Sequence, residues 1–488
     1  MSFLQIAILL VPLLLLLPEK ECLAADDSAD EMKSLRSSLL RSARSKSAKD
    51  DAGVGSGKLD NATYTAVGAE RAGNADGSIP AWTGKMDGLP KGLVYKSTTD
   101  VRPDPYANEK PLFIITSKNM GQYADKLSDG QKALFKKYPD TFAMPVYVTH
   151  RDAKISDFLT QRAAFNAENT KMVNGIDGLQ GYTGGVPFPF PRDGAEVMWN
   201  GRLALFHHTL FGFFDQYAVY PNGQRDWMRQ KYVAEFPFSN PDNIVGIVDD
   251  KIATNAGLVH VTVEKPDRER GQFVVVHEAL DQVRNERMAW AYIPATQRVR
   301  RAPTVGFDTP DGPGGLLTVD DSLGFNGAMY KYRWKFVGKK EMYIPYHNYK
   351  MDTPNVPVEK LLPVGHANPE FMRYELHRVW VVEANLVEGQ RHIYAKRRFF
   401  MDEDSWQFVS TESYDGRGDL WRVSILCSVY DFLLKTYIPR VQMYHDLQRG
   451  SFIAQRMVNY VKPPELNGES MGEAFYSPSS MRREGGVN

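Results

Sequence analysis

Aromatic and basic residues alternate over positions 330–336 of the chain, which read Tyr-Lys-Tyr-Arg-Trp-Lys-Phe. In a β-strand, side chains two positions apart lie on the same face. The pattern therefore predicts a strand with Tyr330, Tyr332, Trp334 and Phe336 on one face and the basic residues on the other. Such a face either fills a core or surrounds an apolar ligand, and core packing is the commoner use of an aromatic stripe.

Further stretches of apolar, β-branched and aromatic residues predict more strands. They cover residues 203–211, 216–220, 257–263, 272–279, 288–293, 330–337, 373–384, 391–401 and 406–414. Many are joined by short, turn-rich links such as Pro221-Asn222-Gly223. Consecutive strands with short links indicate antiparallel meanders. No regular alternation of strands and helices indicates a nucleotide-binding α/β domain.

Helical patterns come earlier in the chain. A helix is predicted over 128–137, where Ser128 and Gln131 match a capping box. A second is predicted over 155–169, which carries apolar residues at helical spacing, and a short one over 119–126. The chain is therefore predicted to be a β-dominated α+β protein with a large antiparallel sheet and covering helices. The sheet either curls around a cavity or belongs to a plain sandwich.

The two ends of the chain differ from its middle. Residues 1–24 predict a secretory signal peptide, because a short apolar run is followed by residues that suit cleavage after Ala24. An uncleaved anchor and a lipid on Cys22 are the alternatives. Residues 25–58 are polar and predict a flexible linker, and the polar tail over 463–488 predicts disorder.

The middle of the chain, residues 59–462, is predicted to be one domain, with a helical and extended region over 59–200 and the sheet over 201–462. The chain has 59 basic and 59 acidic residues, so no basic surplus indicates nucleic-acid binding. Aromatic residues make up 12% of the chain, which suits a β-rich fold. Cys427 lies in an apolar stretch and is predicted to be an inert core thiol.

Histidine patterns give little support for a metal site. Adjacent His207 and His208 would point to opposite faces of a strand and so could not share an ion. His277 lacks the second histidine of a helical zinc motif. Satisfied structural or surface histidines are the better interpretation.

Carboxylates and serines give equally little support for catalysis. The loop over 305–323 lacks the spacing of a calcium motif, so its acids are predicted to be solvated: Asp308, Asp311, Asp320 and Asp321. The chain contains no G-x-S-x-G nucleophile motif. We therefore expect no metal, no cofactor and no enzymatic activity.

Aromatic residues on three predicted strands are the candidates for lining an apolar cavity. They are Trp290, Tyr292, Tyr332, Trp334, Phe336 and Trp380. Three basic residues that follow the 288–293 strand are candidates for holding an anionic headgroup at the rim, namely Arg298, Arg300 and Arg301. If the aromatic faces are core instead, these rings pack against each other and bind nothing. The arginines are then a solvated edge that discourages association between sheets.

Several long motifs are typical of one protein family. They are GAERAGNADGSIPAWTG at 68–84, GGVPFPFP at 184–191 with MWN at 198–200, RVRRAP at 298–303, GFNG at 324–327 and VGKKEMYIPY at 337–346. With them, residues 59–461 resemble a proteobacterial periplasmic domain family of unknown function. The family is often labelled outer-membrane lipoprotein-sorting protein, for its LolA-like fold.

The resemblance implies an incomplete antiparallel barrel, with helices as a lid over an apolar cavity that carries acyl chains. Members tend to be encoded beside RND-type exporters and a companion outer-membrane protein, which implies an inner-membrane exporter and an outer-membrane protein as partners. The family offers no established catalytic residues. Residues 64–200 have no clear counterpart in the shorter LolA-like carriers.

We therefore predict a periplasmic carrier or chaperone that binds a lipid or a lipidated molecule and serves an RND-type exporter, with association with the outer membrane left open. One alternative is an envelope scaffold that docks on an exporter without binding lipid. A second, less favoured, is an envelope hydrolase, which needs a polar pair converging in a cavity.

Overall fold

The computed structural model describes residues 58–247, 256–281, 287–302 and 307–485. The predicted signal peptide over 1–24 and nearly all of the predicted linker over 25–58 lie outside the described residues. No helix in the described ranges is both long and apolar enough to cross a bilayer.

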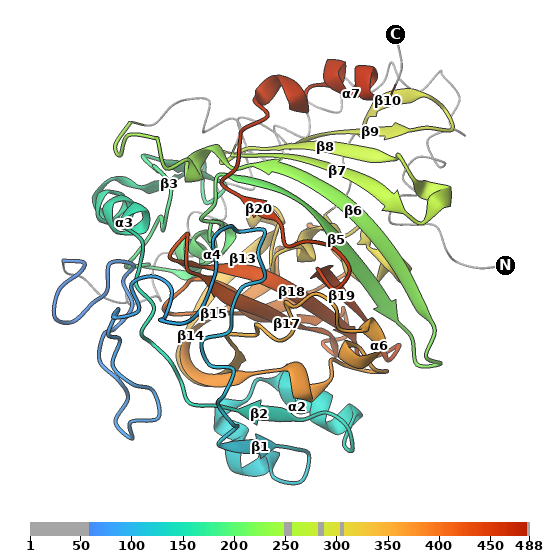
Figure 1. The fold of residues 1–488 in the computed structure, drawn as a ribbon. Helices are drawn as coiled ribbons and strands as arrows, with labels where there is room; N and C mark the ends of the chain where they lie inside the picture. Colours follow the sequence, from blue (N-terminus) through green and yellow to red (C-terminus); the bar gives the residue numbers. More distant parts are fainter. Residues whose placement is uncertain (1–57, 248–255, 282–286, 303–306, 486–488) are drawn as a thin grey trace.

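One sheet of 16 strands dominates the described fold (Figure 1). Its neighbouring strands follow the order β1 (Phe113–Ile115), β2 (Met144–Val146), β14 (Tyr374–Leu386), β15 (Lys396–Asp402), β16 (Phe408–Tyr414), β17 (Leu420–Asp431), β18 (Thr436–Asp446), β19 (Ser451–Met457), β5 (Thr209–Val219), β6 (Arg225–Glu235), β7 (Gly257–Lys265), β8 (Phe273–Glu278), β9 (Met288–Ile293) and β10 (Arg298–Arg301). β13 (Tyr332–Pro345) pairs with β14, and β20 (Glu465–Leu466) pairs with β5.

The sheet is mostly antiparallel and stays open. Among its described strands the parallel pairing joins β2 to β14 at a single position. The order begins at β1 and ends at β10, so the sheet does not close on itself. In Figure 1 the green and yellow strands β5–β10 curve over the orange and red strands β14–β19. The predicted β-dominated α+β fold with a large, curled antiparallel sheet is confirmed.

Two smaller hairpins complete the strands that the structure describes. They are β3 (Lys171–Val173) with β4 (Gly178–Gln180), and β11 (Pro310–Asp311) with β12 (Leu317–Thr318). The described α-helices are α2 (Asp129–Lys137), α3 (Asp157–Asn169), α4 (Gly194–Arg202), α6 (Val358–Leu361) and α7 (Pro478–Glu484).

The first two of these helices match their predictions. The capping box of α2 is present, because Ser128 Oγ accepts the Gln131 N–H at 3.1 Å and Gln131 Oε1 accepts the Ser128 N–H at 2.9 Å. α3 begins two residues later than predicted, after Ser156 caps its first turn. The predicted helix over 119–126 is a 3-10 helix, η2 (Met120–Lys126).

α4 was not predicted, and the strand expected over 203–211 begins only at Thr209. Asp193 caps α4 by accepting the Glu196 N–H at 2.9 Å. α4 packs directly on β13, because a side-chain carbon at Gly194 would lie 2.9 Å from the backbone nitrogen of Phe336. Glycine is therefore required where this helix meets the sheet.

The tail over 463–488 was predicted to be disordered, and this was wrong for its described part. It forms β20, the 3-10 helix η9 (Glu473–Tyr476) and α7. Tyr476 and Met481 are buried against Val233, Phe273 and Tyr292 of the sheet. A few well-spaced apolar residues therefore fix a segment whose overall composition is polar.

Candidate functional site

A cavity of about 500 Å³ lies over β5, β6 and β7, and we call it the β5–β7 groove. Phe211 and Phe213 stand two positions apart on β5, so their rings share one face of the sheet. Val461 and Pro463, in the segment that leads to β20, complete the apolar lining. The groove therefore has an apolar floor made by two parts of the chain that are far apart in sequence.

Glycine allows these two parts to come together. A side-chain carbon on Gly212 would lie 2.8 Å from the ring of Pro464, so any larger residue would push the 461–465 segment away from β5. β20 is held beside β5 by pairing of Glu465 with Phe211. The result leaves the Phe211 side chain 46% exposed, although it stands on a strand inside the sheet. A large exposed aromatic ring in a groove is typical of a surface that binds apolar ligands.

Charged side chains of both signs surround this apolar floor. Arg229 is paired with the buried Asp215, at 2.7 and 2.8 Å, and Lys265 lies 2.7 Å from Asp267. Four further rim residues form no ion pair within the described ranges, namely Arg270, Lys462, Glu264 and Glu465. The rim thus offers two unpaired cations and two unpaired carboxylates, which complements a headgroup that carries both charges.

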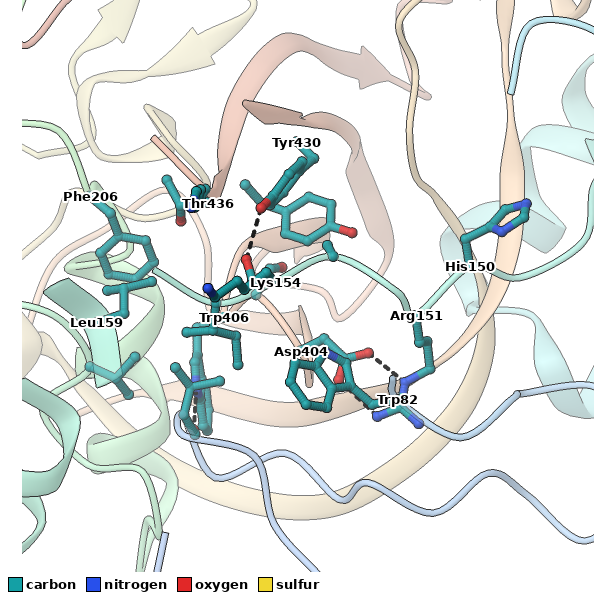
Figure 2. A pocket seen from close by; sticks show the side chains of 17 residues that line it. Trp82, His150, Arg151, Lys154, Leu159, Phe206, Asp404, Trp406, Tyr430 and Thr436 are labelled. Carbon is teal, nitrogen blue, oxygen red and sulfur yellow. Dashed lines mark hydrogen bonds and ion pairs between the residues drawn. The ribbon is translucent and has the colours of Figure 1, made fainter. Parts of the chain in front are cut away.

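A second, smaller cavity of about 30 Å³ lies deeper in the fold (Figure 2). Arg151 and Asp404 face each other there, joined by hydrogen bonds of 2.7 and 2.8 Å. Arg151 also donates to the backbone oxygens of Ala72 and Pro80, at 3.2 and 3.0 Å. This volume suits about one water molecule rather than an acyl chain.

Comparison with known proteins places the chain in a family. Residues 114–482 match the model described as "Protein of unknown function (DUF1329)". The chain is also 41% identical over 429 residues to the uncharacterized protein PA3922 of Pseudomonas aeruginosa. The aligned region covers 87% of this chain and 92% of that protein. The chain belongs to the DUF1329 family. The resemblance noted in the sequence is thereby confirmed.

Two solved structures are similar to this DUF1329 protein at low identity. One is a DUF1329 family protein from Desulfovibrio piger, with 12% identity and a TM-score of 0.40, covering 59% of this chain and 96% of that one. The other is the LolA superfamily protein NE2245 from Nitrosomonas europaea, with 11% identity and a TM-score of 0.36, covering 59% of this chain and 99% of that one. Likenesses at this level say nothing about what the chain binds.

Four of the six predicted lining residues meet in one core cluster of the DUF1329 protein. Tyr332, Trp334, Phe336 and Trp380 pack together with residues of α4 and of the strands β15 and β16. Trp380 stacks on Trp406, with ring centroids 5.2 Å apart. Neither of the two cavities described above is lined by any of the six residues. Their contact with a ligand stays a prediction.

The other two predicted residues, Trp290 and Tyr292, lie apart from these four. They stand on β9 beneath the C-terminal segment, where the Tyr292 hydroxyl donates to the Gly485 oxygen at 2.7 Å. The three predicted rim arginines form part of β10, the last strand of the sheet, where Arg298 and Arg301 are exposed. That position agrees with the solvated-edge interpretation, and a role in headgroup binding stays a prediction.

The acids of the 305–323 loop correct another expectation. Asp320 and Asp321 were predicted to be solvated, but they are only 1% and 3% exposed. Both pair with Arg397, at 2.9 and 2.6 Å, and His392 lies 3.1 Å from Asp320. The spacing of acids in the sequence gave no sign of this cluster, because its cation lies on a different strand.

The histidines singled out from the sequence lie among packed or hydrogen-bonded neighbours of the fold. His277 Nε2 lies 2.8 Å from the backbone oxygen of Tyr476, and His207 is buried without a hydrogen-bond partner among the described residues. Burial, with a smaller effect of nearby arginines, lowers the pKa of His207 to about 3. Burial likewise lowers the pKa of His445 to about 3.

These two histidines make stability depend on pH. In the unfolded chain each takes up a proton as the pH falls through its ordinary pKa of about 6.5, whereas the folded protein keeps both neutral. The free energy of unfolding therefore falls on acidification, by up to about 1.4 kcal/mol per pH unit for each group. We expect the urea midpoint to drop between about pH 7.5 and pH 5, and to drop less in His445→Gln. Equal slopes in the two proteins would contradict this assignment.

Proposed function

We propose that this DUF1329 protein binds a lipid or an acylated molecule in the β5–β7 groove and carries it within the periplasm. The observation that carries the proposal is the exposed ring of Phe211 beside the half-buried ring of Phe213 in a groove of about 500 Å³. Ligand sites are commonly concave, mostly apolar and of about 300–1,000 Å³. The groove therefore has the size and the lining of a site for one chain of an amphiphile.

The energetics favour an acyl chain over a small polar ligand. Each methylene buried against the phenyl rings contributes about 0.8 kcal/mol, so a long chain outweighs the entropy that binding costs. The mixed charges of the rim stabilise a headgroup that carries both a phosphate and an ammonium. Because the groove opens at the surface, the cargo can leave without unfolding of the core.

A binding test follows from the exposure of Phe211. We expect Phe211→Glu to lower the amount of co-purifying lipid at least about tenfold, because the new carboxylate would be buried against an acyl chain. Native mass spectrometry with lipid extraction, on protein purified from its own periplasm, measures the occupancy. Val337→Glu is the matched control, because Val337 is 55% exposed on β13 and does not belong to the groove lining. Equal occupancy in both variants would rule the groove out as the lipid site.

A non-catalytic scaffold that docks on an exporter is the second candidate. The tight packing of Trp380 on Trp406 and Phe336 supports it, because a filled core leaves less room for cargo. Both candidates keep the expected exporter and outer-membrane partners. A lipid-free wild-type protein that stays lipid-free after incubation with envelope lipids would favour the scaffold.

A further inference from the structure

A histidine and two aspartates from separate elements meet beside the smaller cavity. His377 lies on β14, Asp402 ends β15, and Asp404 follows in the turn before β16. His377 Nδ1 lies 3.5 Å from Asp402 Oδ1 and 3.9 Å from Asp404 Oδ2, and one ligand atom of each residue lies within 4.8 Å of the others. The ligand atoms of a tetrahedral ion with bonds of about 2.0–2.1 Å are about 3.3 Å apart. The spacing of the cluster is therefore near that of a metal site.

The hydrogen bonds of His377 leave its inward nitrogen free to be a ligand. His377 Nε2 lies 3.3 Å from Glu375 Oε2. Because an ionised carboxylate can only accept, Nε2 carries the hydrogen of a neutral imidazole and the lone pair lies on Nδ1. Histidines that bind metals typically donate their other ring N–H to a carboxylate in this way.

Asp402 also turns an unpartnered atom toward the same point. Its Oδ2 accepts hydrogen bonds from the Ser405 N–H and hydroxyl, at 2.9 and 2.6 Å, and from the Tyr346 hydroxyl at 3.0 Å. Within the described residues, neither Asp402 Oδ1 nor His377 Nδ1 has a hydrogen-bond partner, although the two side chains are 0% and 1% exposed. Two buried lone pairs at this distance repel each other unless a cation lies between them.

The surrounding carboxylates already have their own cations. The nearest pairs are Glu375 with Arg373 at 2.6 Å, Glu403 with Arg378 at 2.6 Å and Asp404 with Arg151 at 2.7 Å. In the part of the chain that the structure describes, Asp402 has no lysine or arginine partner. Asp402 thus lacks the positive charge that its neighbours have.

We propose that His377, Asp402 and Asp404 bind one divalent transition-metal ion of the zinc class. One imidazole nitrogen and two carboxylate oxygens are a ligand set that zinc accepts. Arg151 holds Asp404 in place, and the bound oxygen keeps a second lone pair for the ion. Asp404 also borders the cavity of about 30 Å³, where a water can complete the coordination (Figure 2).

Zinc titration of the full chain tests this site. The protein is purified without a histidine tag, stripped with a chelator and titrated with zinc by isothermal calorimetry. We expect one zinc per chain, and binding at least about 100-fold weaker in Asp402→Asn, which keeps the shape of the side chain but removes its charge. His260→Gln is the matched control, because the buried His260 also faces a carboxylate, Glu484 at 3.1 Å, but lies outside both the cluster and the small cavity. It should bind zinc like the wild type.

A second measurement uses only the wild-type protein, so it does not require that any variant folds. Cobalt(II) bound to the stripped wild-type protein should give the intense visible bands of a tetrahedral site. A wild-type protein that binds no zinc, an Asp402→Asn variant that is folded by circular dichroism and binds it equally well, or weak octahedral cobalt bands would each overturn the proposal. If the wild type binds no zinc, a second proton on the His377 ring lies between His377 Nδ1 and Asp402 Oδ1 instead of a metal ion.

Discussion

Replacing Arg397 by methionine is expected to lower the free energy of unfolding by about 3–5 kcal/mol. Arg397 is fully buried, and its two terminal nitrogens reach Asp320 Oδ2 at 2.9 Å and Asp321 Oδ1 at 2.6 Å. Its guanidinium also lies 5.1 Å from the ring centroid of Phe399. Removal of the cation leaves two buried carboxylates without their main partner, and the low-dielectric interior does not solvate them.

Urea unfolding followed by circular dichroism measures this loss. Arg417→Met is the control, because Arg417 pairs with Asp415 in an exposed turn and should contribute about 1 kcal/mol or less. A second comparison uses Arg397→Met combined with Asp320→Asn and Asp321→Asn, which removes the uncompensated charges and should recover part of the stability. If Arg397→Met costs no more than Arg417→Met, the cluster has little role in holding the 305–323 loop to β15.

Trp380→Ala should cost about 3–5 kcal/mol in the free energy of unfolding. Trp380 is 1% exposed, stacks on Trp406 and lies 5.5 Å from the Phe336 ring. Its truncation leaves a hole that the neighbouring strands cannot close, because their backbones are fixed by pairing on both sides. The same variant tests the interpretation of the aromatic face as core.

The measurement combines urea unfolding with lipid analysis of the same preparation. Trp227→Ala is the control, since Trp227 is 38% exposed on β6 and should cost about 1 kcal/mol or less. A Trp380→Ala protein with unchanged stability and lost lipid would mean that the face lines a cavity, as the residues proposed from the sequence require. A destabilised protein that retains its lipid would instead show that the cargo binds away from Trp380, in agreement with binding in the β5–β7 groove.

Local sequence patterns predicted those helices and strands whose bounds depend on neighbouring residues in the sequence. The capping residues Ser128 and Gln131 predicted the start of α2. The alternation over 330–336 predicted the first part of β13, although Tyr330 and Lys331 belong to a 3-10 helix, η7 (Met329–Lys331), and β13 continues to Pro345. β6, β17, β18 and β19 were not predicted. In β18 and β19, buried polar residues whose partners are distant interrupt the apolar pattern. Arg440 of β18 is one example, since it lies 2.8 Å from Asp352 and is 1% exposed. A sequence pattern alone indicates an exposed position for such a residue.

The candidate sites were harder to predict for the same reason. The alternation of Phe211 and Phe213 was visible in the sequence, but nothing in it indicated that residues 461–465 would lie across β5. His377 and Asp402 stand on neighbouring strands, and their closeness depends on the register of that pairing. Family membership needed no such information, because long motifs such as residues 68–84 are specific in themselves.

The pairing of β5 with β19 affects how a newly made chain folds. Phe452 lies opposite Val219, so the strand that joins the two wings of the sheet gains this neighbour only after residues 220–451 have been made. Pairings between distant segments are slow to form, because a long loop must close first. A chain with this topology stays incompletely folded for most of its synthesis.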